Sequence, residues 1–323
     1  MLLQAILFIV GAAGLYFGAE WLVRGSSRLA CSFGVSALVV GLTVVALGTS
    51  APELVVSTLA AIRGDGGVAV GNVVGSNILN LALIIGVAAL LMPLQVQMRL
   101  IFREAPVMVA AALTLPILAW DGALSRVDGA LLAVAFAGYL AFVIRSARHE
   151  PEEVLAEYAE FKELQGHGSE ASTRLRDTGL LVVGLAVLAV GAHLLVEAAV
   201  FFARAAGVSD VVVGLTVVAV GTSLPELATS VVAALKKEAD IALGNAIGSN
   251  VFNSLIILGT ASLARPIVVD VAIFDFEVPV MLAISIAFPL LAYARRPLRR
   301  PEGAFLLVFY AAFTSVLLVR TLG

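Results

Sequence analysis

The chain contains the same polar segment twice, each copy inside a stretch that is otherwise apolar. Residues 41–53 read GLTVVALGTSAPE and residues 214–226 read GLTVVAVGTSLPE. A second pair follows, with GNVVGSNILN at 71–80 and GNAIGSNVFN at 244–253. Each matched position lies 173 residues from its partner, and 26 of the 48 positions from 39 to 86 are identical in the second copy. Chance similarity between apolar helices would not place two polar motifs in register, so the chain is an internal duplication.

The composition of the chain places it in a membrane. Hydrophobic residues make up 61% of the chain and charged residues 13%, whereas a soluble domain carries about 25% charged residues. The mean hydropathy is +1.05, which is typical of a chain with many membrane-spanning segments. The net charge of −3 gives no indication of a nucleic-acid partner, and the one cysteine, Cys31, excludes an internal disulfide.

Ten apolar runs have roughly the length of a transmembrane helix, about 17–25 residues. They cover approximately 3–23, 35–61, 68–91, 105–120, 127–145, 179–200, 208–234, 241–263, 278–294 and 303–320. No Lys or Arg precedes the first run, so we expect a retained helix rather than a cleaved signal. We divide the chain into a first repeat at 1–145, a polar linker at 146–178 and a second repeat at 179–323. A regulatory ion-binding loop is the alternative for the linker, but it contains no calcium-loop pattern.

Basic residues predict the orientation, because cytoplasmic loops carry an excess of Lys and Arg. With the N-terminus outside, the outer side holds five of the 20 basic residues and the inner side holds the other 15. The outer five are Arg63, Arg126, Arg204, Arg265 and Arg320. We therefore expect a multi-pass protein of the cell (inner) membrane, with both termini outside and the linker in the cytoplasm.

Each repeat holds an odd number of spans, so the second repeat must enter the membrane from the opposite side. The predicted fold is an all-α polytopic membrane protein of ten transmembrane helices, arranged as two inverted five-helix repeats. Inverted repeats place a substrate site near the bilayer midplane and build it from interrupted helices. Pro52 and Pro225 lie inside spans, where each removes a backbone donor. The freed carbonyls need partners in lipid, and a bound cation is one such partner.

The polar motif residues fall on shared helix faces. In the first repeat one face holds Ala46, Thr49, Ser50 and Glu53, and another holds Asn72, Ser76 and Asn80. The equivalent residues of the second repeat are Ala219, Thr222, Ser223, Glu226, Asn245, Ser249 and Asn253. These faces offer oxygen ligands without imidazole or thiol, which suits a hard cation such as Ca²⁺. A single Ser, Thr or Asn could instead bond neighbouring helices, for about 0.6–2 kcal/mol. Because the whole set accompanies two intramembrane glutamates, we favour a cation site.

Two further acids occupy equivalent positions outside the motifs. Glu104 and Glu277 come two residues before Pro106 and Pro279, where spans are expected to begin. Helix N-termini favour acidic residues, so we interpret both as helix-starting residues. A role in ion access is the alternative.

The paired segments G-x-x-x-x-A-x-G-T-S-x-P-E and G-N-x-x-G-S-N-x-x-N resemble the two alpha repeats of the calcium/cation antiporter superfamily, and those of prokaryotic sodium/calcium exchangers most closely. The resemblance covers essentially the whole chain. It implies a secondary transporter, not an enzyme, that exports Ca²⁺ in exchange for inward Na⁺ by alternating access at one shared midplane site. It also implies Ca²⁺ and Na⁺ as transported ions, no cofactor and a lipid bilayer as the surroundings. We expect the protein to function as a monomer.

The resemblance assigns a role to each motif residue. Glu53 and Glu226 become the shared Ca²⁺ and Na⁺ ligands. The remaining ligands it implies are the side chains of Thr49 and Thr222, the carbonyls of Ala46 and Ala219, the flanking Na⁺-site serines Ser50, Ser76, Ser223 and Ser249, and the central amides of Asn80 and Asn253. Several relatives carry Asp where this chain has Asn253, and in K⁺-dependent relatives such an Asp is tied to K⁺ transport. The neutral Asn253 therefore predicts K⁺ independence.

Three alternative functions compete with Na⁺/Ca²⁺ exchange. Antiport of Ca²⁺ or another divalent cation against H⁺ differs only in the coupling ion, which sequence physics does not determine. A cation channel would also use acidic residues, but channels favour rotational symmetry among subunits. An intramembrane enzyme would need a nucleophile, metal or cofactor motif beside the glutamates, and the sequence contains none.

Overall fold

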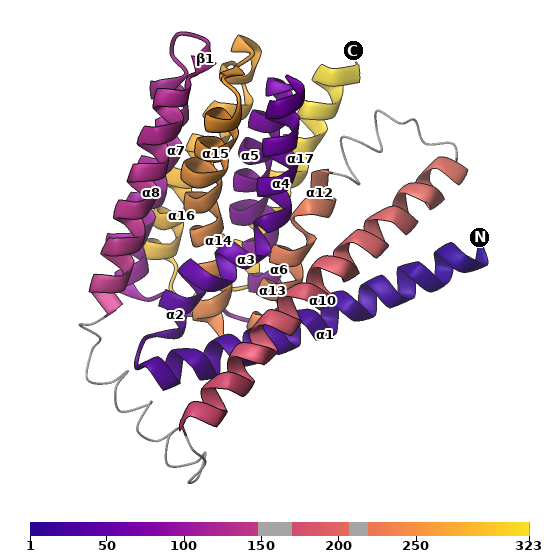
Figure 1. Ribbon diagram of the computed structural model, residues 1–323, viewed down its shortest axis with the longest axis vertical. Helices are drawn as coiled ribbons and strands as arrows, with labels where there is room; N and C mark the ends of the chain where they lie inside the picture. Colours follow the sequence, from indigo (N-terminus) through magenta and orange to yellow (C-terminus); the bar gives the residue numbers. More distant parts are fainter. Residues whose placement is uncertain (148–169, 207–218, 323) are drawn as a thin grey trace. The chain divides into compact units, whose positions relative to one another are not determined.

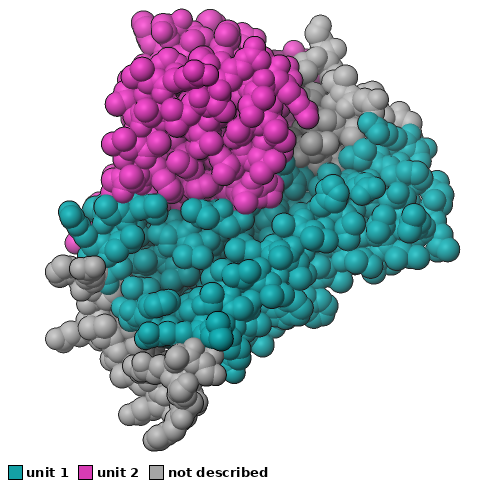
Figure 2. Space-filling model, in the orientation of Figure 1, with its two compact units in different colours: residues 1–49, 140–245 teal, residues 50–139, 246–323 magenta. Residues whose placement is uncertain are grey.

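The computed structural model describes residues 1–147, 170–206 and 219–322, which are almost entirely helical (Figure 1). By its internal contacts the chain divides into two compact units (Figure 2). Unit 1 comprises Met1–Thr49 and Leu140–Asn245, and unit 2 comprises Ser50–Tyr139 and Ala246–Gly323. Each unit therefore contains segments from both sequence repeats. Two of the three dividing points, at 49/50 and 245/246, fall inside the duplicated polar motifs, and the third lies between Tyr139 and Leu140.

Unit 1 is built around two long helices. Its elements are α1 (Leu2–Phe33), α2 (Ala37–Val40), the π-helical η1 (Gly41–Val45), α3 (Ala46–Thr49), α10 (Glu170–Ala205), α12 (Ala219–Thr222), α13 (Leu224–Leu235) and the first part of α14 (Ala239–Phe252). Helices α1 and α10 lie side by side along most of their length (Figure 1). Glycines allow this contact, because a Cβ on Gly18 would lie 2.6 Å from the backbone nitrogen of Leu188. A Cβ on Gly184 would lie 2.6 Å from that of Leu22, so the two backbones touch directly.

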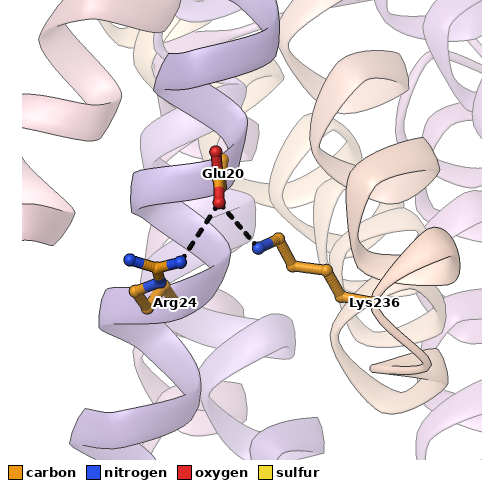
Figure 3. A network of polar contacts seen from close by, with 3 residues as sticks. All are labelled: Glu20, Arg24 and Lys236. Atoms are coloured by element: carbon orange, nitrogen blue, oxygen red, sulfur yellow. Dashed lines mark hydrogen bonds and ion pairs between the residues drawn. The ribbon is translucent and has the colours of Figure 1, made fainter.

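Charged side chains connect α1 to the loop after α13. The carboxylate of Glu20 accepts a hydrogen bond from Lys236 at 2.9 Å and another from Arg24 at 3.2 Å (Figure 3). The hydroxyl of Ser27 donates to the carboxylate of Glu238 at 2.9 Å. This end of unit 1 is therefore held by ion pairs as well as by apolar packing.

Helix α10 begins at Glu170, inside the stretch predicted to be a linker. Contacts with α1 explain why the helix extends beyond the apolar run. The guanidinium of Arg174 donates to the carbonyl of Ser32 at 2.9 Å, and the buried carboxylate of Asp177 lies 3.6 Å from Arg28. The remainder of the linker, at 148–169, lies outside the described residues.

Unit 2 contains the span Gly66–Leu91 and most of the span Ala239–Ala264. Its elements are α4 (Ala51–Arg63), α5 (Gly66–Leu79), the π-helical η2 (Asn80–Ile84), α6 (Ile85–Leu91), the π-helical η3 (Leu100–Glu104), α7 (Ala105–Leu118), β1 (Ala123–Leu124), most of α8 (Arg126–Ala147), the end of α14, the π-helical η5 (Asn253–Ile257), α15 (Leu258–Ala264), β2 (Ile267–Val268), the 3₁₀-helical η6 (Val271–Phe274), α16 (Glu277–Ala294) and α17 (Arg300–Leu322). The two short strands pair antiparallel, with Ala123 opposite Val268.

The described residues supply eight helices long and apolar enough to span a membrane, or nine when the interrupted pair Ala37–Thr49 and Ala51–Arg63 counts as one span. The predicted seventh span, 208–234, lies partly in residues 207–218, outside the described part; only α12 and α13 represent it. For two spans the sequence predicts a start, at 105 and at 278, that lies several residues after the start in the structure. The structure starts them at Leu100 and Val271, because a π turn and a 3₁₀ turn precede α7 and α16.

Two spans are enclosed by protein rather than exposed. In the most apolar 18-residue stretch of Gly66–Leu91, 78% is buried, and in that of Ala239–Ala264, 94% is buried. The corresponding share in the first span, Leu2–Phe33, is 22%. Both enclosed spans carry the G-N-x-x-G-S-N-x-x-N motif. Polar side chains inside a membrane protein face its interior because lipid cannot satisfy them.

Candidate cation site

Each T-S-x-P-E segment breaks its helix at the serine. Helix α3 ends at Thr49 and α4 begins at Ala51, with Ser50 between them at φ −82° and ψ 9°. In the second repeat Ser223 occupies the same place, at φ −92° and ψ 9°, between α12 and α13. A proline follows two positions later in each case, where a helix tolerates its missing N–H. The interruption predicted from Pro52 and Pro225 is present in both repeats.

The break places each glutamate in the first turn of the following helix. Glu53 lies in the first turn of α4 and Glu226 in the first turn of α13. Their side chains are 0% and 1% exposed. A buried carboxylate is costly unless charge or hydrogen bonds compensate it, so two at equivalent positions indicate a functional requirement.

An asparagine from the next helix supports each glutamate through its backbone. In unit 2, Nδ2 of Asn72 donates to the carbonyl of Glu53 at 3.4 Å and to the hydroxyl of Ser57 at 2.9 Å. Ser57 in turn donates to the carbonyl of Ala69 at 3.2 Å. These bonds hold α4 against α5 at the level of the glutamate.

Unit 1 repeats this arrangement around Glu226. Nδ2 of Asn245 donates to the carbonyl of Glu226 at 3.4 Å and to the hydroxyl of Ser230 at 3.1 Å. Oδ1 of Asn245 accepts a hydrogen bond from the hydroxyl of Thr49 at 3.0 Å. The Thr49 hydroxyl also lies 3.3 Å from the carbonyl oxygen of Ala46, one of the predicted carbonyl ligands.

Unit 2 holds four buried asparagines in two side-chain pairs. Nδ2 of Asn80 donates to Oδ1 of Asn250 at 2.9 Å, and Nδ2 of Asn253 donates to Oδ1 of Asn77 at 3.1 Å. Asn80 and Asn253 each begin a π-helical segment, a distortion often found at functional sites. Their Oδ1 atoms are buried and accept no hydrogen bond from the part of the chain that the structure describes.

The remaining predicted residues are distributed between the two units. Ser50 and Ser249 meet in unit 2, where their buried hydroxyls lie 3.0 Å apart. Ser76 is buried in α5 of the same unit, and Ser223 is buried at the break in unit 1. Thr222 is half-buried at the end of α12. Ala219 is the first residue of α12, and its side chain lies outside the described part of the structure.

Sequence reasoning missed four of the residues in this network. Ser57 and Ser230 lie one turn beyond the glutamates, while Asn77 and Asn250 lie within the second motif. All four were detectable, because each pair is separated by the repeat interval of 173 residues and is identical in both copies.

The two acids outside the motifs differ from each other. Glu104 is the last residue of η3, fully buried, with its Oε1 3.8 Å from Nε of Arg99. Glu277 is a half-buried first-turn residue of α16, as its interpretation as a helix-starting acid requires. Within the described residues no group of three or more His, Cys, Asp or Glu side chains could hold a metal.

Comparison with known proteins places this arrangement in a family. The family model described as "Sodium/calcium exchanger protein" matches residues 3–145 and 177–319. The chain belongs to this family. It is a membrane transporter of the cation exchanger type and not an enzyme. The two matched segments correspond to the two copies of the duplicated motifs.

Relatives of similar length share more than a third of their residues with this exchanger. The chain is 39% identical to the putative antiporter CaxA of Alkalimonas amylolytica, over 98% of this chain and 99% of that one. It is 38% identical to the inner membrane protein YrbG of Escherichia coli, over 92% and 91%. It is 36% identical to the sodium/calcium exchanger MaX1 of Methanosarcina acetivorans, over 97% of each chain.

A solved structure shares the fold of this exchanger. The sodium-calcium exchanger NCX_Mj, soaked with Na⁺ and Ca²⁺, matches with a TM-score of 0.82 and 31% identity, over 97% of each chain. The all-α, polytopic fold predicted from the sequence is confirmed by this match and by the two matched repeats.

Proposed function

We propose that this protein is a secondary antiporter that exports Ca²⁺ in exchange for inward Na⁺, by alternating access at one shared site near the bilayer midplane. The observation that carries the proposal is the duplicated glutamate, buried in the first turn after a helix break in each repeat. Glu53 and Glu226 are the principal ligands in this account. In this account both glutamates serve the one shared site, because transporters with inverted repeats build their substrate site from both repeats.

The chemistry of the donor set supports a hard divalent cation. Carboxylate, hydroxyl, amide and carbonyl oxygens are the ligands of Ca²⁺, which takes about 6–8 of them at roughly 2.3–2.6 Å. The flanking ligands are the predicted residues Thr49, Thr222, Ser50, Ser76, Ser223 and Ser249, the carbonyls of Ala46 and Ala219, and the amides of Asn80 and Asn253. Two ionised glutamates balance the charge of one Ca²⁺, so a loaded site is close to neutral.

Charge neutralisation also explains why transport is an exchange. Without cargo, the two carboxylates remain charged in a medium of low dielectric constant, which disfavours passage between the two access states. A site loaded with Ca²⁺ or with Na⁺ removes this penalty. Movement therefore requires one cargo or the other, in contrast to a channel.

The more specific part of the proposal is the identity of the ion that is exchanged for Ca²⁺. The names of MaX1 and NCX_Mj state sodium and calcium exchange for those proteins, and the similarity of this chain to both over nearly its whole length favours Na⁺ here. Antiport against H⁺ is the competing outcome. The neutral Asn253 supports independence from K⁺.

The membrane setting follows from the basic residues. We place the protein in the cell (inner) membrane with both termini outside and residues 146–178 in the cytoplasm, because 15 of the 20 basic residues then lie inside. One chain contains both copies of the ligand set, so a monomer is sufficient for transport.

A flux assay tests the proposal. Purified protein in Na⁺-loaded liposomes should take up ⁴⁵Ca²⁺, whereas K⁺-loaded liposomes and liposomes with an imposed pH gradient should not. Glu53→Ala and Glu226→Ala should each abolish uptake, while Glu277→Gln, a change at a half-buried glutamate outside the motifs, should not. Uptake driven equally well by a proton gradient would establish H⁺ coupling instead. Uptake without any counter-ion would indicate a channel.

A further inference from the structure

Two asparagines that are not among the proposed ligands form hydrogen bonds to two asparagines that are. Asn77 and Asn250 occupy equivalent positions in the two repeats, as do Asn80 and Asn253. The side-chain pairs cross the repeats, so that Asn250 accepts from Asn80 and Asn77 accepts from Asn253. All four side chains lie in unit 2 and are at most 2% exposed.

Hydrogen bonding fixes the orientation of the Asn250 amide. Its Nδ2 donates to the backbone carbonyl of Asn77 at 3.1 Å and points to the sulfur of Met108 at 3.8 Å. A carbonyl oxygen can only accept a hydrogen bond, so the nitrogen of Asn250 must face it. Oδ1 of Asn250 consequently faces the side chain of Asn80. Of the two polar atoms of that side chain, Nδ2 is the one that can donate a hydrogen bond to it.

The Asn77 amide is anchored in a related way. Its Nδ2 donates to the hydroxyl of Ser254 at 2.9 Å and points to the sulfur of Met281 at 3.6 Å. Met108 and Met281 are themselves equivalent positions of the repeats, on α7 and α16. Since a thioether sulfur can only accept, the nitrogen of Asn77 faces it and Oδ1 turns to Asn253.

The two anchors leave one atom of each central amide unused. With their nitrogens engaged, Asn80 and Asn253 turn Oδ1 away from the pair, and neither oxygen accepts a hydrogen bond from any described residue. Leaving a buried acceptor unsatisfied costs about 1–3 kcal/mol. The same cost at two equivalent positions indicates that these oxygens are kept available for a ligand, and a cation is the ligand that the carboxylate, hydroxyl and amide oxygens of this site suit.

We propose that Asn77 and Asn250 are positioning residues, which hold the amides of Asn253 and Asn80 with their oxygens turned toward the transported cation. This inference rests on the proposed cation exchange. Groups that orient metal ligands from behind typically contribute about 10–100-fold to metal affinity. Asn77 and Asn250 act on ion affinity through their partners and touch no ion themselves.

Substitution of the anchors separates this role from simple packing. Asn250→Leu and Asn77→Leu remove the acceptor that fixes each central amide, so the Ca²⁺ concentration for half-maximal exchange should rise about tenfold or more. The maximal rate at saturating Ca²⁺ should fall much less. Ser285→Ala is the matched control, because it removes a buried hydroxyl that bonds to the Met281 carbonyl of its own helix; its half-maximal Ca²⁺ concentration should be unchanged.

A double-mutant cycle shows whether the anchor acts through its partner. Adding Asn250→Leu to Asn80→Ala should cause no further rise in the half-maximal Ca²⁺ concentration, because the amide that it positions is already absent. Adding Asn77→Leu to Asn80→Ala should raise it further, since Asn77 positions the other amide. Full additivity within the Asn80 and Asn250 pair would overturn the inference.

Serine variants and a thermal unfolding measurement distinguish a loss of folding from a loss of ion affinity. If the leucine variants do not fold, Asn250→Ser and Asn77→Ser take their place in the same cycle, because they keep a small polar group at each position. Stabilisation of the purified protein by Ca²⁺ in thermal unfolding should shrink in the anchor variants. Wild-type exchange together with unaltered Ca²⁺ dependence in both anchor variants would overturn this inference alone, whereas a wild type without Ca²⁺ exchange would overturn the proposed function.

Discussion

The hydroxyl of Thr49 donates a hydrogen bond to Oδ1 of Asn245 at 3.0 Å, across 196 positions of the chain. The two residues come from different repeats, yet both belong to unit 1. Asn245 in turn supports the backbone of Glu226. A residue of the first repeat therefore supports the glutamate of the second, and this contact is one of those that join segments of both repeats in unit 1.

This bond predicts a specific sensitivity at position 49. Thr49→Val keeps the shape of the side chain but leaves Oδ1 of the buried Asn245 without its donor, so Ca²⁺ exchange should fall at least tenfold at a fixed, subsaturating Ca²⁺ concentration. Thr49→Ser keeps the hydroxyl and should retain most of the activity. Thr43→Val is the control, because the Thr43 hydroxyl bonds to the Val39 carbonyl four residues earlier in the chain. Equal losses in the Val variants at 49 and 43 would contradict the assignment.

The two supporting asparagines should differ in their contribution to stability. Asn245 is fully buried and bonds to Thr49, Ser230 and the Glu226 backbone, whereas Asn72 is half-buried and bonds to Ser57 and the Glu53 backbone. Asn245→Leu should therefore lower the free energy of unfolding by about 1–3 kcal/mol more than Asn72→Leu. Thermal unfolding in detergent provides the comparison, and an equal effect of the two changes would be the contrary result.

The packing of α1 against α10 predicts a contrast between two glycines of one helix. A Cβ at Gly184 would lie 2.6 Å from the backbone nitrogen of Leu22, but a Cβ at Gly179 would have no described atom within 4 Å. Gly184→Ala should destabilise the protein by about 1–3 kcal/mol through overpacking. Gly179→Ala should be neutral or slightly stabilising, by up to about 1 kcal/mol, because alanine favours the helix. Melting temperatures of the two variants decide this, and a Gly184→Ala protein as stable as wild type would exclude the close contact.

Acidification should inhibit exchange. A protonated carboxyl is a poor cation ligand, so protons compete with Ca²⁺ for Glu53 and Glu226. The initial rate of Na⁺-dependent ⁴⁵Ca²⁺ uptake at subsaturating Ca²⁺ should decrease from pH 8 to pH 5, and higher Ca²⁺ should partly restore it. A rate that stays constant over this range would mean that the carboxylates do not bind the ion.

The repeat and the apolar runs were sufficient to predict the membrane class, the helix breaks and most span positions. Both breaks occur where Pro52 and Pro225 predict them, next to the proline in the first turn of the following helix. Proline alone does not decide this, because Pro116 and Pro289 lie inside unbroken helices. Span ends were less predictable. Helix α10 extends back to Glu170 because Arg174 and Asp177 find partners on α1, a tertiary contact that a hydropathy pattern does not contain.

The supporting residues of the site show a similar limit. Helical periodicity placed Asn80 on the face of Ser76, but it did not single out Asn77, which follows Ser76 directly in the sequence and lies beside Asn80 at the edge of that face. The pairing of Asn77 with Asn253 joins residues 176 positions apart, so it depends on how the two motif helices pack. Identity between the two copies was the available signal, because a buried amide kept in both repeats needs a partner in each.

Equilibrium binding tests the central claim of a single shared cation site most directly. Purified protein should bind ⁴⁵Ca²⁺ at one saturable site that Na⁺ displaces completely, and both Glu53→Gln and Glu226→Gln should lose this binding while Glu277→Gln keeps it. Ca²⁺ that Na⁺ cannot displace, or full binding in either glutamate variant of the motifs, would show that the two repeats do not form one common site for both ions.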